Sequence, residues 1–167
     1  MLRYLTAGES HGQALVVIVE GLPAGMKVTA EDIQAELGRR RLGYGRGPRQ
    51  RFEQDEIVLI GGIRHGRTLG SPVAIEIKNT EWFRSDVWHE EMSPAPGKTK
   101  KPLTQPRPGH ADFVASQKFG GFEDYRGGGH FSGRLTVAVV AAGVVAKAVV
   151  KNLSIQASLI EVGGESS

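Results

Sequence analysis

Short glycine clusters separate the apolar segments of this chain and constrain its fold more than any other feature. Glycine accounts for 23 of the 167 residues, close to twice the usual share of about 7%. The clusters stand beside charged and aromatic residues, as in GESHG (residues 8–12) and GGGHFSGR (residues 127–134). Such neighbours are unlike those of a flexible linker, and glycine lets a backbone approach a ligand closely. The sequence therefore predicts ligand-holding loops on a folded scaffold.

Four apolar segments predict the strands of that scaffold. β-branched residues make Ala14–Glu20 a strand, and Ile57–Ile60 and Pro72–Ile77 read as antiparallel neighbours joined across a glycine-rich turn. A last strand is expected over Ser154–Val162.

Three segments predict helices. Thr29 can cap the first, and Ile33 and Leu37, four residues apart, mark its buried face before Gly38 and the arginines end it. A short helix is expected over His110–Phe119 and a long one from about Ser132 to Lys151. Periodicity alone therefore predicts a mixed α and β protein.

Composition narrows the class of protein. The chain has no cysteine, and no pair of histidines has metal-ligand spacing with a third ligand, so we expect neither disulfides nor a metal. No apolar run approaches the ~18 residues that span a bilayer. The N-terminus has no signal core, which predicts a cytoplasmic protein. No repeat or boundary divides residues 1–167, which predicts one domain, with a mobile loop over the proline-rich residues 79–108.

Two histidines lie on glycine-containing loops. His11 stands between glycines just before a predicted strand, where its imidazole would be accessible as a general acid. His110 follows Arg107-Pro108-Gly109 at the start of a helix, whose free amides attract anions. Each could instead be an ordinary surface histidine at a turn.

Arginines gather between residues 39 and 51, where glycines and Tyr44 interrupt them. A guanidinium meets a carboxylate or phosphate with two parallel hydrogen bonds, so an anion site is the favoured interpretation. A solvated charged face is the alternative. Nucleic acid is a further one, although no base-stacking module accompanies the block.

The segment GGGHFSGR at residues 127–134 opens the long predicted helix. Its consecutive amides, hydroxyl and arginine suit an anion or a ring carbonyl. It matches neither the Walker pattern nor the dinucleotide fingerprint. A helix start without a ligand is the alternative.

Taken together, these clusters resemble the chorismate synthase family, and they occur in the family's order. The matching segments are TAGESHG (6–12), GLPAG (21–25), RRRLGYGR (39–46), RPGHAD (107–112), KFGGFEDYRGGG (118–129), FSGR (131–134) and GVVAK (143–147). The resemblance covers nearly the whole chain and breaks down only at residues 79–101. It implies an α/β fold in which a mixed or antiparallel β-sheet packs on central helices, as in a β-α-β sandwich.

The resemblance also implies an activity. Members of the family eliminate phosphate from 5-enolpyruvylshikimate 3-phosphate to give chorismate, using reduced FMN, in aromatic amino-acid biosynthesis. His11 matches the histidine that protonates the departing phosphate, and His110 matches the histidine beside the flavin. The source of reducing equivalents, NADPH or an external reductase, stays open.

The resemblance assigns binding roles to the remaining motif residues. Ser10, Arg40, Arg46 and Arg134 are expected to bind the anionic substrate, and His130, Phe131 and Ser132 to touch the flavin. Two departures, His130 for the usual arginine and Leu135 for the usual glutamate, affect the details of that contact.

The family's proteins are roughly twice as long as this chain and form homotetramers. The resemblance therefore implies an N-terminal part of such an enzyme, and a homo-oligomer. A flavin- or anion-binding piece without turnover is the alternative function, with a basic nucleic-acid-binding protein ranked below it.

Overall fold

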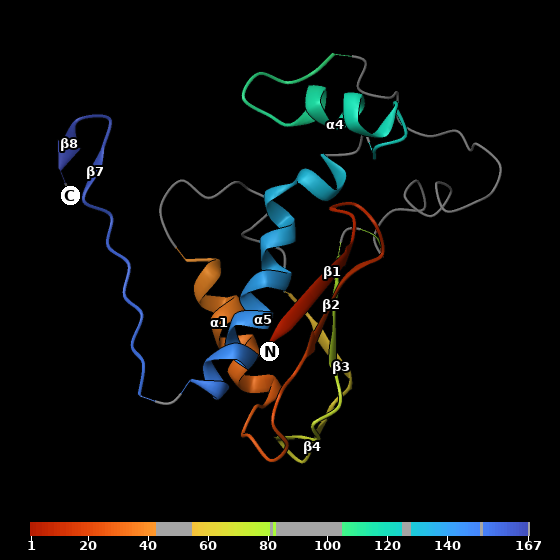
Figure 1. The fold of residues 1–167 in the computed structure, drawn as a ribbon. Helices are drawn as coiled ribbons and strands as arrows, with labels where there is room; N and C mark the ends of the chain where they lie inside the picture. Colours follow the sequence, from red (N-terminus) through yellow and green to blue (C-terminus); the bar gives the residue numbers. More distant parts are fainter. Residues whose placement is uncertain (43–54, 81, 83–104, 125–127, 151, 167) are drawn as a thin grey trace.

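The computed structural model describes residues 1–42, 55–80, 82, 105–124, 128–150 and 152–166. Its base is a four-stranded antiparallel sheet in the order β1-β2-β6-β3. The strands are β1 (Arg3–Gly8), β2 (Ala14–Glu20), β3 (Ile57–Gly61) and β6 (Val73–Lys78). Helices α1 (Ala30–Arg40) and α5 (Thr136–Val149) lie side by side on one face of this sheet (Figure 1). The expected antiparallel sheet packed on helices is confirmed.

The core lies between the sheet and these two helices. Alternate residues of β2 point into it, so Leu15, Val17 and Val19 are buried, whereas Ile18 on the other face is 40% exposed. Val17 lies opposite Ile75 of β6, which is also buried. This period of two is what one covered face of an antiparallel sheet requires.

Helix α1 begins where the sequence predicted. The Thr29 hydroxyl accepts a hydrogen bond from the Asp32 amide, and the Asp32 carboxylate accepts one from the Thr29 amide, which completes a capping box. Ile33 and Leu37 are buried against the sheet and α5, as expected. The helix continues past Gly38 to Arg40, so its predicted end was early.

The second core helix, α5, is rich in alanine and valine. Ala138, Ala141 and Val145 are buried, and their small side chains let the helix pack closely on α1 and β2. Two short 3₁₀ turns, η3 (Gly129–Phe131) and η4 (Gly133–Leu135), precede it, so the predicted start at Ser132 was early. The short helix α4 spans Asp112–Phe119, so it begins two residues later than expected and ends at the expected residue.

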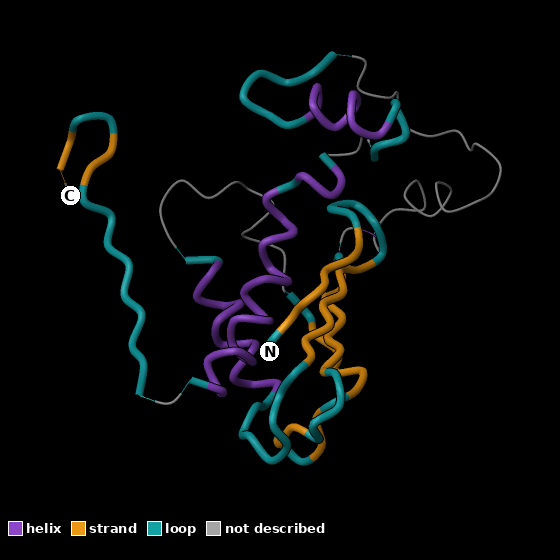
Figure 2. Tube along the Cα trace, in the orientation of Figure 1, coloured by secondary structure: helices purple, strands orange, loops and turns teal. Residues whose placement is uncertain are grey.

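One strand of the main sheet was missed, and one expected strand does not form over its predicted length. β1 was missed because its side chains are largely exposed and give no apolar alternation. The strand expected over Ser154–Val162 is wrong: residues 153–160 form no regular structure in the described part of the chain (Figure 2). Within that range the structure has one short strand, Glu161–Val162 (β7), which pairs with Glu165–Ser166 (β8). A strand needs a neighbour for its backbone hydrogen bonds, and apolar alternation does not supply one.

Two further features complete the description. A small hairpin of β4 (Ile63–Arg64) and β5 (Arg67–Thr68) extends from β3. Most of the expected loop at residues 79–108 lies outside the described residues, as does Arg46. Among the described helices, none combines the length and the apolar character that crossing a membrane demands.

Candidate active site

The two glycine clusters that the sequence singled out meet at one end of the sheet. The loop between β1 and β2, residues 9–13, lies against the turn that contains Gly129 and His130. The Ser10 amide donates to the Gly129 carbonyl at 3.3 Å, and a ring nitrogen of His130 lies 3.4 Å from the Gly8 carbonyl. Segments more than a hundred residues apart therefore form one surface.

Ser10 and His11 form the tip of the β1–β2 loop. Ser10 is fully buried, and its hydroxyl lies 2.9 Å from Nδ1 of the half-buried His11. Gly8 has a φ of 105°, and a Cβ there would overlap the Ala14 carbonyl oxygen, so the loop can leave β1 only at a glycine. The geometry gives His11 a fixed hydrogen-bonding neighbour and partial access to solvent.

His110 belongs to a cluster of three charged or titratable groups at the start of α4, together with Arg107 and Asp112. Its Nδ1 lies 2.5 Å from Oδ1 of Asp112. Arg107 donates to both carboxylate oxygens of Asp112 at 2.8 Å and approaches the His110 ring at 3.3 Å. The Arg107 hydrogen bonds hold the pKa of Asp112 well below its ordinary range, with a smaller contribution from His110. The carboxylate that orients His110 is therefore ionised at neutral pH.

Gly128 joins the His110 cluster to the glycine-rich turn. Its φ is 95°, and a Cβ at this position would lie 2.5 Å from the His110 ring. The imidazole thus packs directly on the backbone that leads into Gly129 and His130. Ser132 follows, and its hydroxyl accepts a hydrogen bond from the Arg134 amide at 3.2 Å. Phe131 is half-buried and stacks at a tilt on Phe119, 5.8 Å between ring centres.

Arg134 is buried beneath this surface. Its Nη1 donates to Asp55, its Nε to the Asn79 side-chain oxygen at 3.1 Å and its Nη2 to the Lys78 carbonyl at 3.2 Å. All three nitrogens therefore have acceptors within the protein. This arrangement favours a supporting role, and direct contact with substrate stays a prediction for Arg134.

Arg40 reaches the same region from the end of α1. Its Nη2 donates to the Gly133 carbonyl and to the Thr136 hydroxyl, both at 3.1 Å. The last turn of α1 is thereby tied to the 3₁₀ turn before α5. Arg40 thus lies beside the glycine-rich turn, as an anion-binding arginine would need to. Arg46 lies outside the described residues.

A hollow of about 230 Å³ opens beside the glycine-rich turn. Its lining residues are Glu9, Phe119, Phe122, Glu123, Asp124, Gly128, His130 and Phe131. The phenylalanines and the imidazole fit one side of a flat aromatic ring such as that of a flavin. None of these lining residues is a lysine or arginine that would neutralise the phosphate of FMN. This lining thus offers an aromatic face to the ring of FMN, whereas its three carboxylates, Glu9, Glu123 and Asp124, leave the phosphate of FMN to groups elsewhere.

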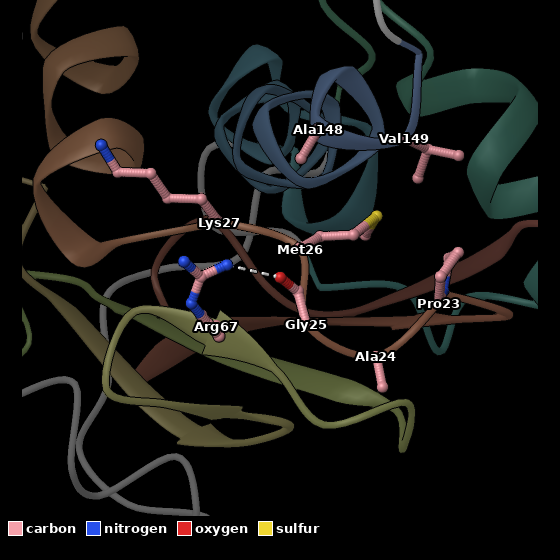
Figure 3. Close-up of a pocket in the computed structure, with 8 residues that line it drawn as sticks. All are labelled: Pro23, Ala24, Gly25, Met26, Lys27, Arg67, Ala148 and Val149. Carbon is pink, nitrogen blue, oxygen red and sulfur yellow. Dashed lines mark hydrogen bonds between the residues drawn. The ribbon is translucent and has the colours of Figure 1, made fainter.

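A larger hollow of about 550 Å³ lies near the C-terminal end of α5 (Figure 3), and its lining contains none of the predicted site residues. The turn at residues 23–27 and the helix residues Ala148 and Val149 line it, and Arg67 donates to the Gly25 carbonyl at its edge. Its two cations, Lys27 and Arg67, are exposed. Size alone therefore does not identify the active site here.

Sequence reasoning missed the residues that orient the predicted ones. Asp112 stands two residues after His110, inside the same motif, and could have been proposed as its partner. Asn79 follows the inner strand β6 directly, at the end of the sheet where the β1–β2 loop lies. Asp55 carried no local signal, because its partner Arg134 is distant in sequence.

Comparisons with known proteins agree on one family. The family model described as chorismate synthase matches residues 2–166. The chorismate synthase of Thermobifida fusca is 57% identical over 88% of this chain and 39% of its own length. That of Salinispora tropica is 51% identical over 98% of this chain and 44% of its own length. This chain thus spans about two-fifths of the length of these relatives.

A solved structure shows the same likeness. The structure, titled "Crystal Structure of Chorismate Synthase", matches 88% of this chain and 33% of the other with a TM-score of 0.59 and 35% identity. The shared fold and the sequence motifs therefore point to the same group of enzymes.

Proposed function

The chain belongs to the chorismate synthase family, and we propose that it carries part of a lyase site that converts 5-enolpyruvylshikimate 3-phosphate to chorismate. The observation that supports this most is the meeting of the His11 loop, the His110 cluster and the Gly128–Ser132 turn at one end of the sheet. These groups come from three separate motifs, and the proposed reaction needs all three in one place.

His11 is the proposed proton donor. In the elimination, a carbon–oxygen bond of the ring breaks, phosphate departs with the bonding electrons, and a ring proton is lost as a double bond forms. Proton transfer to the departing phosphate lowers the charge that it must carry, as general acid catalysis does. The Ser10 hydroxyl, 2.9 Å from Nδ1, supports this role because it orients the ring.

His110 is the proposed residue beside the cofactor, reduced FMN. When bound, reduced FMN would supply electron density transiently to the reacting ring, with no net redox change. The ionised Asp112 orients the His110 ring, and Phe131, His130 and Ser132 are the proposed contacts of the flavin ring. His130 and Phe131 line the 230 Å³ hollow, which supports their assignment, and Ser132 follows them directly in the chain.

Arginine side chains are the proposed holders of the substrate's phosphate and carboxylates. Arg40 lies next to the glycine-rich turn, where a guanidinium can bind an anion with two hydrogen bonds. The family's motifs add Arg46, Ser10 and Arg134 to the residues that we propose to bind the anionic substrate. A homotetramer in the cytoplasm is proposed on the same grounds.

A flavin- or anion-binding unit without turnover is the second candidate, because the chain spans only 39% of the Thermobifida fusca relative. A chimera separates the two, with residues 2–166 of this chain replacing the matching part of that enzyme. We expect the chimera to form chorismate with reduced FMN and to change the flavin spectrum when substrate is added. A chimera that is folded and binds flavin but makes no chorismate would contradict the lyase proposal for this chain.

A further inference from the structure

Asn79 occupies the junction between the sheet and the loop that carries His11. It follows the last residue of β6, and its side chain is fully buried. Its backbone amide donates to the Gln13 carbonyl at 3.1 Å, which continues the pairing of β6 with β2. Asn79 therefore stands at the base of the β1–β2 loop.

The side-chain amide of Asn79 closes this loop. Its nitrogen donates to the Gly12 carbonyl at 2.6 Å and to the Glu9 carbonyl at 3.1 Å. These two carbonyls bracket Ser10 and His11 in the sequence. Since an amide nitrogen carries two hydrogens, both donors are used and the loop is held on each side of the histidine.

The amide oxygen of Asn79 fixes the orientation of the amide. It accepts a hydrogen bond from Nε of Arg134 at 3.1 Å. Arg134 in turn is held by Asp55 and by the Lys78 carbonyl. The buried guanidinium can only donate, so it keeps the Asn79 oxygen toward itself and the nitrogen toward the loop.

We infer that Asn79 is a positioning residue for His11, an inference that rests on the proposed role of His11 as proton donor. Without its two donors, the Glu9 and Gly12 carbonyls lose the hydrogen bonds that tie them to the end of β6. The Gly12 amide still donates to the Glu9 carbonyl at 3.1 Å, but that bond lies within the loop and leaves the loop free to shift relative to the Gly128–Ser132 turn. A displacement of about 1 Å at a reacting group can cost about a hundredfold in rate. Asn79 thus acts on the reaction through the loop backbone.

Asn79→Asp tests this inference because it keeps the size of the side chain and its contact with Arg134 but removes both donors. In the chimera with the Thermobifida fusca enzyme we expect kcat to fall by about tenfold to a hundredfold, with KM within about twofold. Asn152→Asp, the same chemical change at an exposed residue, should leave both unchanged. Asn79→Ser, which retains one donor, should give a smaller loss of kcat.

A double mutant identifies the route of the effect. If Asn79 acts through His11, then Asn79→Asp should cost little further activity in the His11→Ala background, because the positioned group is already gone. An equal loss in both backgrounds, or an unchanged kcat in Asn79→Asp, would overturn the inference.

An NMR measurement separates this inference from the proposed function. In the 167-residue chain, Asn79→Asp should shift the His11 ring ¹⁵N signals, which report the Ser10 hydrogen bond at Nδ1, and leave those of His65 in place. If His11→Ala proves fully active, the proton-donor role fails, and these shifts alone then decide whether Asn79 orients the ring. Unchanged His11 signals would refute the positioning role whatever the kinetics show.

Discussion

Arg134 forms a buried ion pair with Asp55, although 79 residues separate them. Asp55 precedes β3, and its carbonyl also accepts a hydrogen bond from Gln34 of α1 at 3.0 Å. Arg134 lies in the turn before α5. The pair therefore joins the sheet, α1 and the glycine-rich turn beneath the candidate site.

Removing one partner of this pair should destabilise the fold strongly. Arg134→Ala leaves the Asp55 carboxylate buried without its counter-charge, and we expect a loss of about 3–5 kcal/mol in the free energy of unfolding, measured by urea titration. Arg39→Ala removes an exposed guanidinium that pairs with Glu36 and should cost no more than about 1 kcal/mol. Equal losses in the two variants would contradict a buried structural role for Arg134.

Asp112 should make stability depend on pH. Its pKa is lowered in the folded state by Arg107, whereas it returns to about 4 on unfolding. The stabilisation is then present above about pH 4 and declines as the pH falls toward the folded-state value. Urea titrations should therefore show a larger difference in the free energy of unfolding between wild type and Asp112→Asn at pH 6 than at pH 3.

A carboxylate elsewhere serves as the control for that pH series. Glu161→Gln removes an exposed carboxylate in the β7–β8 hairpin and should give no comparable change with pH. If the difference in the free energy of unfolding between wild type and Asp112→Asn is the same at pH 6 and pH 3, the Arg107–Asp112 ion pair contributes nothing to stability.

Gly128→Ala should displace the His110 ring. Gly109 and Gly128 both have positive φ, but only at Gly128 would a Cβ meet the imidazole. We therefore expect Gly109→Ala to lower the free energy of unfolding by about 1 kcal/mol, through backbone strain alone. Gly128→Ala should lose more stability and also shift the His110 ring signals in NMR spectra. Gly133→Ala, with ordinary φ and open space, should be nearly neutral. Unmoved His110 signals in Gly128→Ala would refute the close packing.

Arg40→Lys tests the arginine beside the glycine-rich turn. Lysine keeps the charge but cannot present two parallel donors, so substrate affinity in the chimera should fall by about 1–3 kcal/mol. Arg39→Lys, one residue earlier on the exposed side, is the matched control. Isothermal titration of both variants decides the matter, and an unchanged dissociation constant for Arg40→Lys would assign Arg40 a purely structural contact with Gly133 and Thr136.

The sequence predicted those parts of the fold that local chemistry determines. Ala14–Glu20 and the capped start at Thr29 are confirmed because alternation and capping act within a few residues. The loops around His11 and His110 were recognised from their glycines. The strand at Ser154–Val162 could not be judged in this way, since pairing depends on a partner that the pattern does not name.

The residues that support the site could not be predicted from the sequence either, because they also depend on distant partners. Asn79 and Asp55 act on segments far away in the chain, and no spacing connects them to the Ser10–His11 loop or to Arg134. The motif of Arg134 predicts an anion-binding residue because it stands at a helix start, and that role stays a prediction. Only the folded arrangement shows that the guanidinium of Arg134 forms a buried ion pair with the Asp55 carboxylate.

The most direct test of the proposed function is turnover after His11→Ala in the chimera with the Thermobifida fusca enzyme. Removal of the proton donor should lower chorismate formation by about a hundredfold or more, while FMN binding is retained. His89→Ala, at a histidine outside every motif, should be nearly silent. Turnover of the His11→Ala enzyme within a few-fold of its parent would contradict the assignment of His11 and with it the proposed mechanism.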